Sequence, residues 1–321
     1  MTRLALLHPS NLLGSEVRET LGRRRELWHE IRLLTDDEEE AGTLTDVAGA
    51  AAMVTALEAG DLDRVDVAFF CGGIEKSRPL IAALPASATP IILSPDAAPG
   101  DGEAVVAGVN LESARAGAPL VSPHPGAVLL AHLLHPLRDL RPARASATLL
   151  QPASALTRAA LDEVFEQTRG ILRFDPKASR QVFGTQVAFN AIPSPTSAEQ
   201  LVPHLRAVLD PPPEELAVQV LQTGVFHSFG ASLHVVLAED PGPEEVRRAL
   251  AKHPFNDLAV DPELLGMIDA AARDEVLVGP VEPDPGCGGG YWIWAVMDNL
   301  TCGGAGNAVR ILEAILQPLV H

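Results

Sequence analysis

The stretch VSPHPGAVLLAHLLHPL, residues 121–137, decides how this chain is organised. Its leucines recur at helical spacing, as Leu129 and Leu133 do, and a second set lies on the adjoining face. A helix that is apolar on most of its sides is buried rather than amphipathic. Pro125 suits the first turn, where its fixed φ and missing N–H do no harm. We therefore expect a buried helix near Pro125, with the rest of the chain arranged around it.

The sequence on either side of this helix has two different patterns. Before it, short apolar runs alternate with turns and helices, as in residues 4–21 and in DVAFFCGG, residues 66–73. Such alternation predicts a doubly wound parallel sheet. After it, longer strands and hairpins predict an α+β domain. The expected fold class is α/β, with a Rossmann-type domain over residues 1–124 and an α+β domain over residues 125–301.

Composition excludes several classes of protein. The 321 residues are 47% hydrophobic, which is enough for two domain cores. Lys and Arg number 24 against 42 Asp and Glu, and the resulting charge of −18 disfavours nucleic acid and anionic lipid. Three cysteines without a CxxC pair argue against a disulfide framework or a zinc module. No segment is apolar for long enough to span a membrane, so we expect a cytoplasmic protein.

Several blocks, in the same order along the chain, resemble the aspartate-semialdehyde dehydrogenase family. They are residues 66–73, residues 122–137, VAFNAIP at residues 187–193, and DNLTCGGAGNAVRILEAIL at residues 298–316. The resemblance implies a glyceraldehyde-3-phosphate-dehydrogenase-like fold and a homodimer formed through the second domain. It also implies that the last helix, residues 302–321, packs back on the first domain.

The positions that carry chemistry in this family agree less well than the framework. On this alignment the nucleophilic cysteine is Pro125 and the histidine that acts as acid and base is Phe229. The substrate-binding arginine and lysine are Gln222 and Gln200, and a phosphate-binding arginine falls at or near Pro99. Gln151, a pocket residue of the family, is retained. Because acyl transfer through a thiolate needs these groups, we predict a non-catalytic binding or scaffold protein, similar to the Usg-like branch.

The same resemblance gives candidate cofactor-binding residues. They are Gly14, Gly72, Gly73 and Asn299. Two other turn positions, which are glycine in dinucleotide-binding units, are His8 and Asn11, whose side chains stand where a diphosphate would lie. The acidic run TDDEEE, residues 35–40, disfavours the 2′-phosphate of NADP. No cofactor is certain, and binding of NAD or NADP stays open, with NADP disfavoured.

Two alternatives remain at this stage. The first is an NAD(P)-dependent oxidoreductase with rearranged groups, in which His8, Cys71, His124 and His227 approach the old cleft. Their dispersal along the chain gives no metal-ligand signature, so no metal is expected. The second is a scaffold whose dimer pairs with a catalytic paralogue and presents a surface to a partner.

Overall fold

The computed structural model describes residues 2–174 and 179–317 and divides the chain into two compact units. One unit is formed by Met1–His124 and Gly304–His321, and the other by Pro125–Gly303. Each unit is built on one sheet. None of the described helices is both long enough and apolar enough to cross a lipid bilayer.

The first unit is an eight-stranded sheet with the order β3-β4-β2-β1-β5-β6-β8-β7. All neighbouring strands run parallel except the β3–β4 hairpin at one edge. The strands are β1 (Arg3–Leu7), β2 (Glu30–Thr35), β3 (Leu44–Val47), β4 (Ala50–Ala56), β5 (Val67–Phe70), β6 (Thr89–Ile92), β7 (Glu103–Ala104) and β8 (Leu120–Val121).

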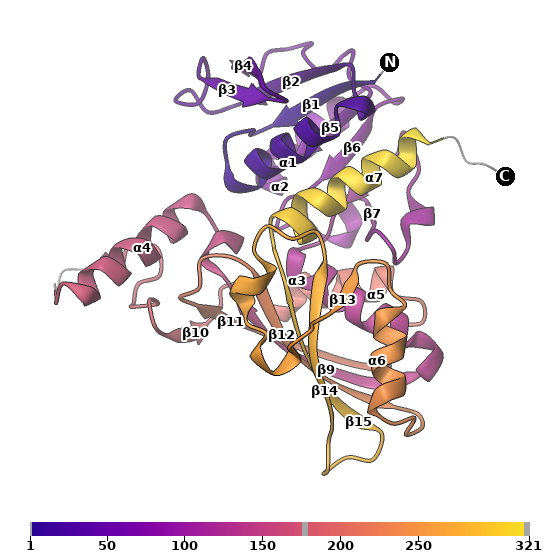
Figure 1. The fold of residues 1–321 in the computed structure, drawn as a ribbon. Coiled ribbons are helices and arrows are strands. Elements are labelled where there is room, and N and C mark those ends of the chain that lie inside the picture. The colour runs from indigo at the N-terminus through magenta and orange to yellow at the C-terminus, as the bar shows by residue number, and fades with distance from the viewer. Residues whose placement is uncertain (1, 175–178, 318–321) are drawn as a thin grey trace. The chain divides into compact units, whose positions relative to one another are not determined.

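Helices cover both faces of this sheet, as the alternating pattern predicts. They are α1 (Leu12–Arg23), α2 (Ile74–Ala83) and the C-terminal α7 (Asn307–Leu316). Helix α7 packs beside α1, and its Ile311 and Leu312 belong to the same buried cluster as Leu6 and Val17 (Figure 1). The C-terminal helix therefore completes the core of the first unit, and the expected α/β class is confirmed.

The second unit is a seven-stranded sheet with the order β10-β11-β9-β12-β15-β14-β13. Its pairs are antiparallel except β9–β11 and β13–β14. The strands are β9 (Pro142–Gln151), β10 (Ala191–Pro193), β11 (Glu215–Thr223), β12 (Phe229–Leu237), β13 (Asn256–Leu258), β14 (Val276–Pro283) and β15 (Gly290–Met297). The helices are α3 (Pro125–Leu134), α4 (Arg158–Leu172), α5 (Ala198–Val208) and α6 (Pro243–Ala251).

Helix α3 is the buried helix that residues 121–137 predict. It begins at Pro125, and every residue from Gly126 to Leu134 is buried. It packs on β9, β12 and α5. Helices α5 and α6 pack on the same sheet, against β11 and β14 (Figure 1). The carboxyl ends of β9 and β11 lie side by side, because Gln151 is opposite Gln222 in the parallel register.

Candidate functional site

The turn between β1 and α1 is held by side-chain hydrogen bonds. The Asn11 side chain caps α1 by accepting from the Gly14 N–H at 2.7 Å, and its Nδ2 donates to the Cys71 carbonyl at 2.8 Å. A Cβ on Gly14 would lie 2.1 Å from the carbonyl oxygen of His8. Gly14 is therefore required by packing, and Asn11 fills the role that a bound anion has at the start of such a helix.

The His8 ring lies directly over Gly72. A Cβ on Gly72 would stand 2.3 Å from His8 Cδ2 and 2.5 Å from Nε2. The backbone of His8 is left-handed, with φ of 57°, a conformation that few residues other than glycine adopt. The ring Nδ1 is 3.5 Å from Asp36 Oδ1, and Asp36 in turn pairs with Lys76 at 2.8 Å. A side chain therefore covers the glycine that the sequence places on the cofactor-facing rim.

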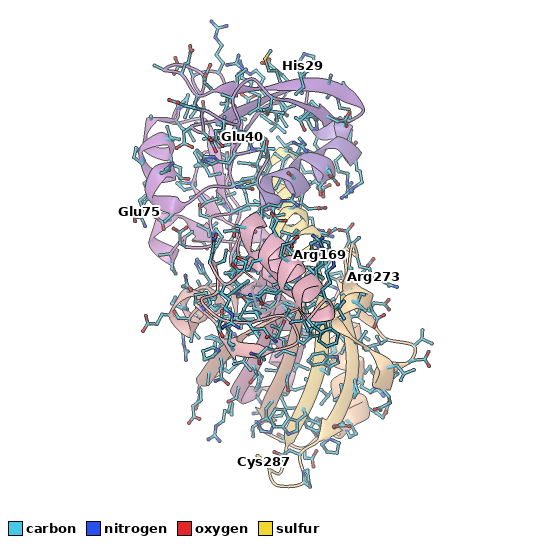
Figure 2. All side chains as sticks on the ribbon, turned by 90° about the vertical axis from the view of Figure 1, so that its left-hand side faces the viewer. His29, Glu40, Glu75, Arg169, Arg273 and Cys287 are labelled. Atoms are coloured by element: carbon cyan, nitrogen blue, oxygen red, sulfur yellow. The ribbon has the colours of Figure 1, made fainter. Side chains whose placement is uncertain are left out.

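A cavity of about 630 Å³ opens beside His8 and is mainly acidic. Its charged lining consists of one lysine and four carboxylates, of which Glu40 and Glu75 are labelled in Figure 2. The full lining is His8, Ser10, Asn11, Asp37, Glu40, Gly72, Gly73, Glu75, Lys76 and Asp96. The hydrogen bond from Lys76 lowers the pKa of the neighbouring Asp36, which keeps that carboxylate charged at neutral pH. A diphosphate meets repulsion in this cavity.

The first amide of α2 is also engaged. The Ile74 N–H donates to Asp96 Oδ1 at 3.1 Å, immediately after Gly73, which is the N-cap of α2. Asn11 has the same role as N-cap of α1. At the start of both α1 and α2, a side-chain oxygen therefore already accepts a hydrogen bond from a backbone N–H. The turn keeps Gly14 but has His8 and Asn11 in place of the other two glycines, and these side chains fit a diphosphate poorly.

The candidate redox and metal residues do not form one cluster. Cys71 is buried, and burial raises the pKa of its thiol, which disfavours the nucleophilic thiolate. His8 lies near it across Gly72, and His124 is buried in the same unit. His227 is exposed and belongs to the second unit. Across residues 2–174 and 179–317, no three His, Cys, Asp or Glu side chains converge as a metal site.

In the second unit, the ends of four adjacent strands form one buried row. Gln222 is opposite Gln151 in the register, and Phe229 is opposite Met297. All four are completely buried, and β12, which begins at Phe229, pairs with β9, which ends at Gln151. Phe229, with which the resemblance aligns the family's histidine, is thus a buried phenyl ring that cannot transfer a proton.

Pro125 stands close to this row. A Cβ on Gly303 would lie 3.0 Å from Pro125 Cβ and 2.4 Å from the terminal methyl of Met297. Pro125 and Met297 therefore both pack against Gly303. Pro125, the first residue of α3, has neither a thiol nor a backbone N–H. Together with Met297 it makes one side of the row apolar.

The other side of the row is a pair of amides whose orientation is fixed. Gln222 Nε2 donates to two backbone carbonyls, those of Gln151 at 3.2 Å and Thr223 at 2.9 Å. Its Oε1 must therefore be the atom that accepts from Gln151 Nε2 at 3.1 Å. Gln151 Oε1 is then left buried with no hydrogen-bond partner among the described residues.

Asn299 ties together two loops next to this row. Its Oδ1 accepts from the Ser228 N–H and from the Ser154 hydroxyl, each at 3.0 Å. Because a backbone N–H can only donate, the Asn299 atom that faces Ser228 must be Oδ1, and the other atom of the amide is Nδ2. Asn299 Nδ2 and Ser228 Oγ are buried without a partner in the part of the chain that the structure describes. Asn299, which the resemblance gives as a cofactor-binding candidate, lies in the second unit, where it joins these loops.

Two further predicted positions have local structural roles. Gln200 closes the capping box of α5, where its Oε1 accepts from the Ser197 N–H at 2.9 Å. Pro99 is exposed and begins a single 3₁₀ turn that ends at Asp101. Sequence reasoning missed Asp96 and Ser228, because a single acid in a loop and a serine beside a histidine have no distinctive spacing.

Comparisons with known proteins agree with the fold. Residues 134–302 match the family model described as semialdehyde dehydrogenase, dimerisation domain. A USG-1 protein homolog of Azotobacter vinelandii is 30% identical, with 98% of this chain and 97% of that protein covered. Aspartate-semialdehyde dehydrogenase 2 of Vibrio cholerae is 26% identical over the same shares of the two chains.

Comparison with solved structures points to the same family. A probable aspartate-semialdehyde dehydrogenase from Pseudomonas aeruginosa superposes with a TM-score of 0.92 at 26% identity, covering 98% of each chain. The Vibrio cholerae enzyme II, complexed with ASA, superposes with a TM-score of 0.88 at 25% identity over 99% of each chain. This chain therefore belongs to the semialdehyde dehydrogenase family, on the branch that includes the USG-1 homologues.

Proposed function

We propose that this protein is a binding member of its family that does not oxidise a semialdehyde. Two observations carry the proposal: Pro125 packs with Met297 against Gly303, and the buried Phe229 is opposite Met297 in the register. The resemblance aligns Pro125 with the family's nucleophile and Phe229 with its acid–base histidine. Neither side chain can form or resolve a covalent acyl intermediate. The amides of Gln222 and Gln151 also hold each other, and they offer no positive charge to an anionic substrate.

The test is a direct assay of the purified protein. Aspartate semialdehyde, the substrate named by the relatives, is supplied with inorganic phosphate and either NADP or NAD, and reduced cofactor is followed by absorbance. We expect no rate above that of a protein-free blank, with the Vibrio cholerae enzyme assayed in parallel as the active control. A protein-dependent rate that survives repeated purification would refute the proposal.

The cofactor part of the proposal is weak nucleotide binding. His8 covers Gly72, Asn11 and Asp96 hold the first amides of two helices, and the cavity is acidic. We expect NAD to bind weakly and NADP more weakly, because the 2′-phosphate adds charge near the acidic run at residues 35–40. Calorimetric titration with each nucleotide measures this directly, and tight binding of NADP would contradict it.

We further propose that the protein is a homodimer formed through the second unit. This is the unit that matches the dimerisation-domain model. On one face of its sheet, the side chains of Thr148, Ser232 and Trp294 are only partly buried and lie in one row. A row of partly buried side chains on a sheet face suits a self-complementary, two-fold interface. Light scattering coupled to gel filtration should give twice the chain mass of 33.9 kDa.

A further inference from the structure

Two buried histidines join helix α3 to the segment that follows helix α6. His132 lies in α3 and is 2% exposed, and His253, which comes just after the end of α6, is 4% exposed. Their rings meet edge to face with centroids 4.7 Å apart, and Nδ1 of His132 is 3.4 Å from Nε2 of His253. The Phe255 ring lies against both, 5.5 Å from the centroid of His132 and 5.9 Å from that of His253. The pair belongs to neither the buried row nor the acidic cavity.

The hydrogen bonds of the pair fix where each ring carries its hydrogen. The Phe255 N–H donates to His253 Nδ1 at 3.3 Å, so this nitrogen is an acceptor and the neutral ring carries its hydrogen on Nε2. His253 Nε2–H in turn faces His132 Nδ1, which must accept. In each ring, the nitrogen that could take up a further proton is therefore already an acceptor in a hydrogen bond.

Protonation of either ring breaks one of these hydrogen bonds. A proton on His253 Nδ1 would oppose the Phe255 N–H, and a proton on His132 Nδ1 would oppose His253 Nε2–H. Each would also place a positive charge among buried groups, which is costly. The folded structure therefore favours the neutral form of both rings.

A third histidine and a cation face the pair from the 3₁₀ turn that follows α3. His135 begins this turn, which ends at Leu140, and the centroid of its ring is 6.0 Å from that of His253. Nε2 of His135 is 2.8 Å from Nη1 of Arg138, which can only donate. The guanidinium therefore adds positive charge near the pair, which opposes its protonation further.

The other elements around the pair contribute mainly apolar groups. None of the buried residues of β9, β12 and β14, the strands that pack against α3 and α6, is titratable. Of the buried residues on α5 and α6, His204 alone is titratable. In the segment that carries His253, Lys252 and Asp257 are exposed. The pair is thus surrounded mainly by apolar side chains, other histidines and a cation.

Asn256 makes the pair part of a joint between three elements. Its Nδ2 donates to the carbonyl of His132 at 3.0 Å and to that of Leu250, in α6, at 3.1 Å. Asn256 is also the first residue of β13, the edge strand of the sheet, which pairs with β14. The joint therefore docks both the end of α6 and an edge strand on α3.

We propose that the His132–His253 pair is an acid-sensitive latch that holds the α6–β13 segment, residues 243–258, on α3 at neutral pH and releases it in mild acid. A histidine released into water takes up a proton near pH 6.5, so the open form binds more protons than the docked form. The contribution of the latch is complete above about pH 6.5 and is lost as pH falls below this value. Release uncovers the edge of β14.

The test is amide hydrogen exchange of the full-length protein at about pH 7 and about pH 5.5, corrected for the intrinsic pH dependence of exchange. The amides of residues 246–258 are compared with those of β9 in the same unit, which serve as the internal reference. One pH unit below 6.5, each released ring favours the open form about tenfold. Opening of the segment should therefore rise up to about 100-fold relative to β9.

Variants connect the pH dependence to the pair. His132→Asn keeps an oxygen acceptor for His253 Nε2–H but does not titrate, so the rise should fall to about tenfold, the share of one ring. The smaller side chain also loosens the joint at neutral pH, and for this reason the ratio between the two pH values is compared. His227→Asn replaces an exposed histidine of the same unit and is the matched control, which should keep the full rise.

A second measurement needs no variant. Long-range ¹H–¹⁵N magnetic resonance spectra of the wild type at neutral pH should show Nδ1 without a hydrogen in both His132 and His253. A hydrogen on either Nδ1 would overturn the inference. So would an equal rise of opening in the segment and in β9, or a full rise in His132→Asn. None of these outcomes depends on whether the protein oxidises a semialdehyde, so the latch and the proposed function are tested separately.

Discussion

Tyr291 is the only tyrosine in the chain, so its ionisation can be followed without interference. It is buried in β15; its hydroxyl donates to Asp240 and accepts from the Gly242 N–H at 2.9 Å. Burial, and then the bond to Asp240, raise the pKa of Tyr291 above its ordinary value. The neutral form is therefore favoured in the folded state. This contribution to stability is complete below about pH 10 and is lost as pH rises through the folded pKa.

The prediction is that tyrosinate absorbance in the native protein rises at higher pH than in the protein unfolded by denaturant. Asp240→Asn should lower the pH midpoint of this titration in the native protein. The variant lacks the carboxylate that accepts the hydrogen bond from the Tyr291 hydroxyl and repels the phenolate. Burial remains, so the midpoint should stay above that of the unfolded chain. Coincident native and unfolded titrations would show that the environment of Tyr291 is not the one described.

His8 is the second residue whose replacement is informative. Its ring covers Gly72, and its φ is 57°, so glycine fits the backbone without strain. His8→Gly should uncover the glycine rim and strengthen NAD binding by about tenfold or more, as measured by calorimetry. His8→Asn, which tolerates the same backbone but keeps a side chain, is the control and should gain less. Unchanged NAD affinity in His8→Gly would mean that the acidic lining, rather than the ring, limits binding.

At the scale of elements, Glu163 and Gln167 on α4 organise the loop that follows the helix. Glu163 is buried and accepts from the Val182 N–H at 2.8 Å and the Phe183 N–H at 3.1 Å. Gln167 Oε1 accepts from the Val187 and Ala188 N–H groups at 2.7 and 3.0 Å. Side chains of α4 thus accept the hydrogen bonds of four backbone N–H groups in residues 182–188, which have no strand or helix partner there.

We predict that Glu163→Gln lowers the free energy of unfolding by about 1–3 kcal/mol, because an amide N–H would face backbone donors. Glu166→Gln is the matched control on the same helix. It breaks only an exposed pair with Arg169, which is labelled in Figure 2, and should cost less than about 0.5 kcal/mol. Denaturant unfolding of both variants measures the difference, and equal losses would refute the anchoring role of Glu163.

The strands and helices with clear periodicity were predictable from the sequence, whereas the β3–β4 hairpin was not. Residues 47–59, VAGAAAMVTALEA, are rich in helix-forming alanine. They form β4 because Ala48 and Gly49 both have positive φ, which closes a two-residue turn, and Val54 is buried beside Leu33. Pairing with β2 therefore overrides local propensity. Sequence alone cannot weigh such a contact between segments distant in the chain.

The resemblance gives the candidate site as a set of positions, Pro125, Phe229 and Gln222, and these positions stay a prediction. Sequence alone does not give the interactions of these side chains. It could not reveal that Gln222 fixes the orientation of Gln151, since this depends on two carbonyls at the ends of separate strands. The Ser228 N–H likewise donates to Asn299 Oδ1, from a residue 71 positions away in the chain.

For the whole molecule, the proposed dimer gives a prediction about one sheet face. Thr148 is opposite Ser232 in the register and is only partly buried. Thr148→Arg should place an unpaired charge within the proposed interface and shift the protein to monomers in light scattering. Ala51→Arg, an exposed strand position in the first unit, is the control and should leave the mass unchanged. An unaltered dimer in Thr148→Arg would place the interface elsewhere.

The contact of Pro125 and Met297 with Gly303 bears on how this branch can change in evolution. Under our proposal Pro125 stands at the family's nucleophile position, and a cysteine placed there would lie next to Gly303, against which the methyl group of Met297 also packs. Apolar surroundings favour the thiol over the thiolate. A substitution of Pro125 alone would therefore not supply an ionised nucleophile, and a descendant of this sequence that acquired the family's chemistry would need several changes together.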